Sequence, residues 1–273
     1  MKMKANLDSK KMSMGEIHDS LRAMLKVIDL VCKDNNITYF LSGGTAIGAI
    51  REEGIIPWDD DIDIMLPRGD YEKLISILEK KNNGRYKVYS LHDSSWNRPY
   101  SCFVDDDTIA KHELVDYSHL GVTMDILPMD GLSSSPKKVY KYYKRLRLIY
   151  SFYYSSLKVN FSPDEKLIQL KKIVSIFTKL IGAHRICKHI DNTAKKYAYE
   201  SSQYVGCSVL IHFMEREWFK KEWFKEQVYV PFEGEKFPVM NGYDNYLKSL
   251  YGNYMKRPEQ ESDPDHHTSY YWK

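Results

Sequence analysis

The stretch from Ile37 to Leu66 constrains the fold more than any other part of the chain. It has the sequence ITYFLSGGTAIGAIREEGIIPWDDDIDIML. We expect a strand over 37–41, a glycine turn, a short helix over 45–53 that ends at Gly54, and a second strand that carries aspartates. Apolar residues surround these acids, unlike those of a solvated acidic loop. The stretch therefore predicts a buried α/β unit with a group of carboxylates.

The alternation of side chains along a strand predicts how the acids are arranged. Asp59, Asp61 and Asp63 should share one face, and Asp60 should leave by the opposite face. Carboxylates held this close repel one another and retain a proton near neutral pH unless a cation lies between them. The pattern thus predicts a metal site that includes Asp61 and Asp63.

A third acid, Asp125, lies in the apolar stretch GVTMDILP. A lone carboxylate on a core strand costs several kcal/mol unless it is paired or binds a metal. Asp130 is an alternative, but it precedes Gly131 and is interpreted as a turn residue. Asp125 is therefore the expected third member of the site.

Other phosphate and metal motifs fit less well. Gly43-Gly44 can bring backbone N–H groups to an anion at the start of a helix, but the turn lacks the lysine of a P-loop. An EF-hand would need a glycine where Ile64 stands. Zinc is not predicted at His184, Cys187 and His189, because they do not all share one helix face and no fourth ligand is evident.

Periodicity and turn signals extend the prediction along the chain. They predict helices over 13–33 and 71–80, helices opened by Ser135-Pro136 and Ser162-Pro163, and further helices over 184–200 and 243–251. Strands are expected over 86–91, 100–104, 108–112 and 121–127, with a hairpin at Glu233-Gly234. The predicted fold class is α/β (α+β), with a mixed-sheet core over 1–131 and a mostly helical part over 132–273, which could form one continuous domain.

Composition restricts the functional class. The chain has 273 residues, 43% of them hydrophobic and 28% charged, as is typical of a soluble globular protein. A net charge of +3 does not favour a nucleic-acid partner. No apolar run of about 18 residues and no secretory signal is visible. Four scattered cysteines favour reduced thiols and a cytoplasmic location.

Three motifs together resemble the LicD family of the nucleotidyltransferase superfamily. They are GGTAIGAIREEGIIPWDDDIDI, GVTMDILPMD and YDNYLKSLYGNYM, followed by His266-His267. The resemblance runs from about residue 13 to the C-terminus, although 135–225 matches in character rather than in residues. It implies a nucleotidyltransferase-like mixed sheet with helices.

The resemblance also implies an activity. Members transfer a phosphoalcohol, typically phosphocholine from CDP-choline, to a hydroxyl of a cell-surface glycan or teichoic acid precursor and release CMP. Related fukutin-type proteins use CDP-ribitol, so the alcohol is not fixed by the resemblance. Asp61, Asp63 and Asp125 would hold two Mg²⁺ ions, with Mn²⁺ as an alternative, and Asp125 could also serve as the general base. Gly43, Gly44 and Thr45 would hold phosphate oxygens.

Further candidates for donor binding are less specific. Arg51 and Arg68 could clamp phosphate, or could equally form ordinary ion pairs. Trp58, with Trp96 and Tyr100, could cage a quaternary ammonium, although aromatic residues are more often part of a core.

The segment Lys137–Arg147, KKVYKYYKRLR, contains six basic residues and no acid. It could be a solvated helix packed by its aromatic stripe, or it could contact an anionic membrane or a phosphate-rich acceptor. A lipid-linked acceptor would favour the second interpretation and a location at the inner face of the membrane.

Two other functions remain open. A true nucleotidyltransferase would use an NTP and release pyrophosphate. A glycan-binding scaffold would have lost its catalytic site, which the presence of the glycines and aspartates disfavours.

Overall fold

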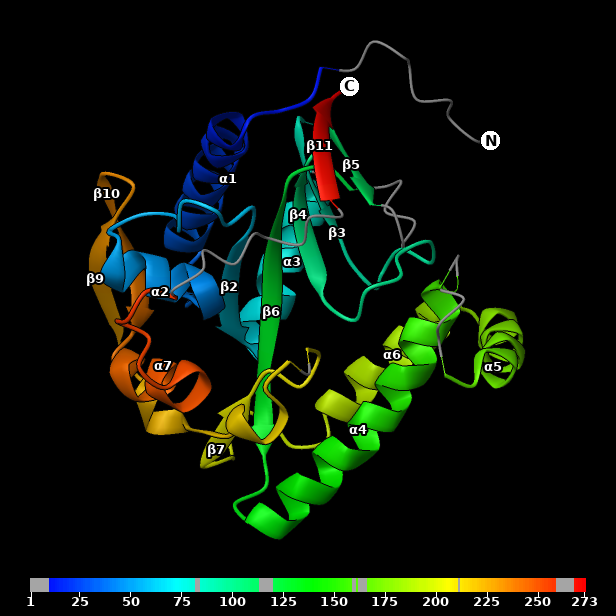
Figure 1. Ribbon diagram of the computed structural model, residues 1–273. Coiled ribbons are helices and arrows are strands. Elements are labelled where there is room, and N and C mark those ends of the chain that lie inside the picture. Colours follow the sequence, from blue (N-terminus) through cyan, green and yellow to red (C-terminus); the bar gives the residue numbers. More distant parts are fainter. Residues whose placement is uncertain are drawn as a thin grey trace.

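A mixed sheet organises the molecule (Figure 1). The computed structural model describes residues 10–81, 84–112, 120–158, 161, 166–210, 212–258 and 268–273. The sheet has the strand order β1-β2-β6-β4-β3, and β7 and β8 extend it from the far end of β6. These strands are β1 (Phe40–Leu41), β2 (Ile62–Pro67), β3 (Tyr86–Tyr89), β4 (Ser101–Asp105), β6 (Thr123–Leu132), β7 (Tyr204–Gly206) and β8 (Phe219–Lys220).

The centre of the sheet is the parallel pair of β2 and β6. All ten residues of β6 are buried, as expected for a strand covered on both faces. The other pairings are antiparallel, so the sheet is mixed, as predicted. Together with the helices of the chain, this sheet confirms the α/β class predicted from the sequence.

Three helices pack around this sheet (Figure 1). Helix α1 (Met14–Asp34) begins with the predicted capping box between Ser13 and Glu16 and packs against β4 and β6. Helix α2 (Gly43–Arg51) follows β1, and α3 (Arg68–Lys80) follows β2.

The second half of the chain adds helices and short strands. Helix α4 (Pro136–Leu157) packs against α5 (Ile168–Ile181) and α6 (Ala183–Ala194). The expected hairpin is β9 (Gln227–Phe232) with β10 (Glu235–Met240), and the expected helix is α7 (Tyr243–Tyr251). Strand β11 (Thr268–Trp272) pairs with β5 (Thr108–His112), and short 3₁₀ turns cover Met214–Arg216 and Lys221–Phe224.

The sequence prediction was wrong in local details. Strand β2 begins only at Ile62, because Asp59, Asp60 and Asp61 precede it and aspartate is disfavoured in strands. Helix α2 begins at Gly43 rather than at residue 45. Asp130 is not a turn residue but a buried residue of β6. The proposed start of a helix at Ser162-Pro163 lies outside the described residues.

The core joins both halves of the chain. Its main cluster includes Leu21, Phe40, Ile126 and, from the second half, Phe232 and Leu247. A smaller cluster lies between α4 and α6. Strand β6 runs across the boundary expected near residue 131, and the division into two parts stays a prediction. Within the described ranges, every helix is too short or too polar to cross a membrane.

Candidate active site

Two of the predicted aspartates are neighbours across the central strands. Asp63 of β2 is paired in register with Asp125 of β6. Because β2 and β6 are parallel, both side chains point to the same side of the sheet at this level. The predicted association of Asp63 with a later acid therefore has a structural basis.

The three aspartates before β2 complete the acidic cluster. Carboxylate oxygens of Asp59, Asp60 and Asp61 all lie within 4.8 Å of one another. The prediction that Asp60 would leave by the opposite face was therefore wrong, since no strand alternation operates before Ile62. Asp60 is also hydrogen-bonded to Tyr270 of β11. This aromatic partner could not be inferred from its position in the sequence.

Burial and mutual repulsion shape the titration of these acids. Burial, together with the charges of Asp125 and Asp59, raises the pKa of Asp63 well above its usual value. Burial and then the charge of Asp63 raise the pKa of Asp61 in the same direction. Burial and the charge of Asp60 raise the pKa of Asp59 to about 6. The acids therefore lie close together in a place where water stabilises their charged forms poorly.

Glycines allow the cluster to lie against the N-terminus of α2. A Cβ atom on Gly43 would stand 2.8 Å from Asp63 Oδ2, and Gly43 has a φ of +54°. A Cβ atom on Gly44 would stand 3.0 Å from Asp59 Oδ2. The positive end of the helix dipole favours the charged form of both acids. Glycine is therefore required here for close approach as well as for backbone conformation.

The predicted phosphate-binding groups hold Asp63 in place. The Gly43 N–H donates to the Tyr246 hydroxyl at 3.1 Å, and the Asp63 N–H donates to Thr45 Oγ1 at 2.8 Å. The first contact fixes the start of α2 to α7, and the second fixes it to β2. Their role in binding phosphate stays a prediction.

Arg98 is the cation that sequence reasoning missed. Its Nη1 lies 3.6 Å from Asp125 Oδ1, and its guanidinium lies 5.8 Å from the centre of the Tyr100 ring. The Cys102 thiol donates to the same Asp125 oxygen at 3.0 Å, and burial raises the pKa of Cys102 so that it remains a thiol. Arg98 lies in a loop with no periodic pattern, so only the fold reveals its place.

Two predicted arginines lie elsewhere. Arg51, in the last turn of α2, pairs with Glu52 and donates to the Tyr254 carbonyl at 2.9 Å. Arg68 forms a bidentate pair with Asp130, with contacts of 2.8 and 2.5 Å. Asp130 is five residues beyond Asp125 on β6, about 16 Å along a strand. The structure brings neither arginine to the carboxylates.

The aromatic candidates are divided between core and site. Trp96 is buried, stacks on Tyr89 with a centroid distance of 5.5 Å, and donates to the Tyr100 carbonyl. Trp58 is partly buried against the main core. Of the three aromatic residues, Tyr100 accepts a hydrogen bond from Arg98, the arginine that also lies beside Asp125. An ammonium cage formed by all three is not evident in these contacts.

A small pocket of about 80 Å³ opens beside the glycine turn. Its lining includes Gly43, Asp63, Tyr246, Tyr251 and the buried carboxyl of Glu217. Burial raises the pKa of Glu217 well above its usual value. The tyrosines belong to the motif YDNYLKSLYGNYM, which carries the family resemblance but had no assigned site role. His266 and His267 lie outside the described residues.

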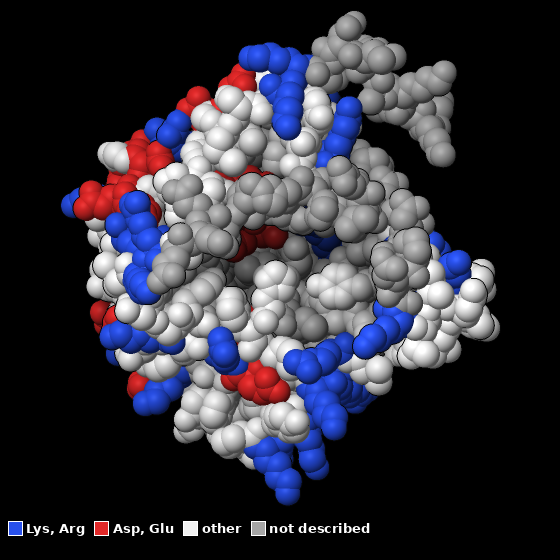
Figure 2. Space-filling model, viewed as in Figure 1, with Lys and Arg blue, Asp and Glu red and all other residues white. Residues whose placement is uncertain are grey.

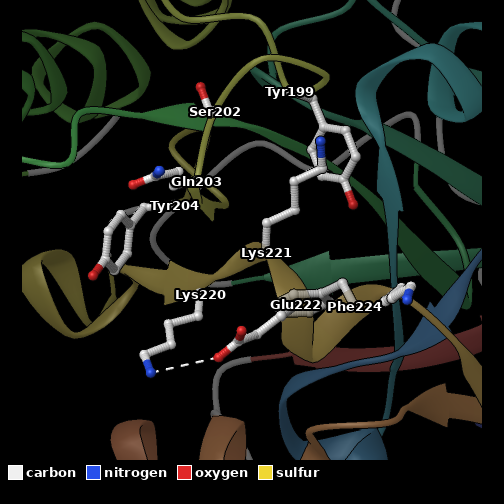
Figure 3. A pocket seen from close by; sticks show the side chains of 9 residues that line it. Tyr199, Ser202, Gln203, Tyr204, Lys220, Lys221, Glu222 and Phe224 are labelled. Carbon is white, nitrogen blue, oxygen red and sulfur yellow. Dashed lines mark ion pairs between the residues drawn. The ribbon is translucent and has the colours of Figure 1, made fainter.

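Figure 2 shows acidic side chains within a hollow near the centre of this face. Figure 3 shows a different pocket, of about 560 Å³, lined by residues of β7, β8 and the 3₁₀ turn Lys221–Phe224, where Lys220 and Glu222 form an ion pair. Tyr204 of that pocket is paired with Leu132, seven residues beyond Asp125 and about 23 Å along β6. The larger pocket therefore does not belong to the acidic cluster.

The acidic cluster lies in a region that matches a known protein family. Residues 36–162, which contain the cluster, match the family model "LicD/FKTN/FKRP, nucleotidyltransferase domain". The fold and the match define a protein with a nucleotidyltransferase domain. The chain is also 30% identical over 264 residues to the lipopolysaccharide cholinephosphotransferase LicD of Haemophilus influenzae, across 94% of this chain and 97% of that protein. The chain belongs to the LicD family.

Two other comparisons are more limited. An uncharacterised protein of Rickettsia prowazekii is 37% identical over 82 residues, which cover 30% of this chain and 29% of that protein. The solution structure of the antibiotic-resistance factor ANT(2'')-Ia is 17% identical, with a TM-score of 0.25, over 62% of this chain and 88% of that chain.

Proposed function

We propose that this protein transfers choline phosphate from CDP-choline to a hydroxyl of a cell-surface glycan, with lipopolysaccharide as the first acceptor to consider. The observation that carries the proposal is the pairing of Asp63 with Asp125 beside Asp59 and Asp61. Membership of the LicD family, and the name of the Haemophilus influenzae relative, support choline phosphate as the transferred group and lipopolysaccharide as the acceptor, and CDP-choline is our proposal for the donor. Ribitol, glycerol and ethanolamine are alternative alcohols, and a teichoic acid precursor is an alternative acceptor.

The residues of the cluster fit Mg²⁺. Several carboxylate oxygens, the ligand type that Mg²⁺ prefers, converge in a partly buried place where their charges raise one another's pKa. We assign Asp61, Asp63 and Asp125 as ligands of two ions, with Mn²⁺ as an alternative, and Asp59 as a further candidate. When bound, the metal would neutralise the diphosphate and polarise the acceptor hydroxyl.

The protein's own groups then have separate tasks. The acceptor oxygen forms a bond to the phosphorus that carries choline, while the bond from that phosphorus to the CMP oxygen breaks. The hydroxyl proton passes to a base, for which Asp125 is the candidate in addition to its assignment as a ligand. Arg98, 3.6 Å from Asp125, is placed to contact the donor phosphates. Tyr246 and Thr45 hold Gly43 and Asp63 in register.

A nucleotidyltransferase that attacks the α-phosphate of an NTP is the second candidate, because it would use the same acidic cluster. A non-catalytic scaffold is the third, and it is disfavoured by the assembled carboxylates. The two enzymatic hypotheses differ in the phosphorus that is attacked and therefore in the leaving group.

The deciding experiment compares donors. The protein is incubated with Mg²⁺ and with CDP-choline, CDP-ribitol, CDP-glycerol or CDP-ethanolamine, or with CTP or ATP, in the presence of lipopolysaccharide. CMP release that is highest with CDP-choline is the expected result. Pyrophosphate release from an NTP, with no CMP from any CDP-alcohol, would instead establish the nucleotidyltransferase. An Asp106→Asn variant serves as the active control, because Asp106 pairs with Lys87 and Lys273 away from the cluster.

A further inference from the structure

Helix α5 exposes an apolar face. Six of its large apolar side chains are between 51% and 76% exposed, whereas apolar residues of a surface helix normally face the core. Spacings of three and four residues place most of them on one side of the helix. They are Leu170, Ile173, Ile176, Phe177, Leu180 and Ile181.

The opposite side of α5 attaches to the protein through small polar residues. Ser175 and Thr178 are buried, and Ser175 Oγ donates to the Ser155 carbonyl of α4 at 2.9 Å. Thr178 Oγ1 donates within its own helix to the Val174 carbonyl at 3.0 Å. The helix thus has its polar side against the protein and its apolar side outward.

Cations border the apolar face. Lys172 and Lys179 are exposed and lie seven residues apart, which places them along one border of the face. Helix α4 adds further exposed cations toward its N-terminal half, and then the exposed apolar residues Leu148 and Phe152. Neither α4 nor α5 contains an acidic residue. Figure 2 shows the basic side chains along α4 and the uncharged surface over α5.

We infer that the α5 face, flanked by the cations of α4 and α5, docks onto the surface of an anionic lipid bilayer. Apolar side chains can enter the interface between headgroups and acyl chains, while lysines extend toward the lipid phosphates. A second copy of this chain would bring a second set of cations against the first, and like charges disfavour that contact. Charge and apolar character therefore point together to an anionic membrane.

Docking on a membrane would affect how the protein meets its acceptor. The hollow with acidic side chains and the cations of α4 are visible on the same face of the molecule (Figure 2). If the function proposed above holds, a membrane-bound protein would present this face to a lipid-linked glycan. The docking itself does not depend on that function and is measured without any substrate.

The test is flotation of the purified protein with phosphatidylcholine vesicles, with and without phosphatidylglycerol. We expect binding to the anionic vesicles that weakens with salt. Leu180→Glu should reduce partitioning at least about tenfold, because it places a charge within the apolar face. The matched control is Leu30→Glu, which changes another exposed leucine, on α1, and should bind as the unmodified protein does.

A second variant separates charge from apolar contact. Lys141→Glu/Lys144→Glu should weaken binding to anionic vesicles at least about tenfold. Absence of vesicle binding by the unmodified protein would overturn the inference, as would equal binding by Leu180→Glu and Leu30→Glu. A dimer in solution that Leu180→Glu converts to a monomer, without change in vesicle binding, would show that a second copy covers this face. None of these outcomes affects the donor experiment.

Discussion

Asp59→Asn should stabilise the metal-free protein at neutral and higher pH. Burial and the charge of Asp60 raise the pKa of Asp59 from 3.8 to about 6 in the folded protein. Because the folded value is raised, the ionised side chain costs stability above the unfolded value of 3.8. The cost grows until the pH passes about 6 and is then constant.

The magnitude follows from the same shift. A shift from 3.8 to about 6 is roughly two pKa units, or about 3 kcal/mol at most. The substitution should therefore raise the free energy of unfolding by about 2–3 kcal/mol at pH 8 in EDTA and by little at pH 4. Added Mg²⁺ should reduce or reverse the gain, because asparagine is a weaker ligand than a carboxylate.

The assay is urea denaturation at several pH values, with EDTA or Mg²⁺. Asp106→Asn is the matched control of opposite sign, because Lys87 and Lys273 lower the pKa of Asp106 despite its partial burial. That variant should lose stability above the unfolded pKa of aspartate. A destabilised Asp59→Asn in EDTA at pH 8, or an equal gain at pH 4 and pH 8, would refute the electrostatic account of the cluster.

Two further substitutions test the placement of individual residues. Gly43→Ala should lower kcat/KM by about 100-fold, because the new Cβ displaces Asp63 and the residue has a positive φ. Steady-state CMP release would measure the loss. Near-normal activity would contradict the claim that glycine is required here for close approach. Arg68→Ala should lower the free energy of unfolding by about 3–5 kcal/mol, because it leaves the buried Asp130 unpaired. Thermal or urea unfolding would measure the loss of stability. A variant that is stable but has a raised KM for the donor would instead support the hypothesis that Arg68 clamps phosphate.

The acidic cluster illustrates how far local sequence patterns reach. Apolar neighbours correctly marked Asp63 and Asp125 as acids on buried strands, since alternation and hydrophobicity are local properties. Their side-by-side register depends on the pairing of β2 with β6, which joins residues far apart in the chain. The strand pattern failed for Asp60, because three successive aspartates delay the start of the strand.

Other features required tertiary information. Arg98 lies in a loop, and its approach to Asp125 follows from the pairing of β4 with β6. The apolar periodicity of α5 was visible in the sequence, but the sequence could not show which side faces the protein. Arg68 and Asp130 are residue types usually found at protein surfaces. Only the structure shows that they lie together, largely shielded from solvent near the ends of adjacent strands, and form an ion pair.

The central claim is that the site formed by the carboxylates beside α2 catalyses the transfer of choline phosphate. The most direct test measures radiolabelled choline transferred from CDP-choline to Haemophilus influenzae lipopolysaccharide, with Mg²⁺, by the unmodified protein, Asp63→Asn and Asp106→Asn. We predict transfer by the unmodified protein and by Asp106→Asn, and a loss of at least about 1,000-fold in Asp63→Asn. Undiminished transfer by a folded Asp63→Asn variant would contradict the account.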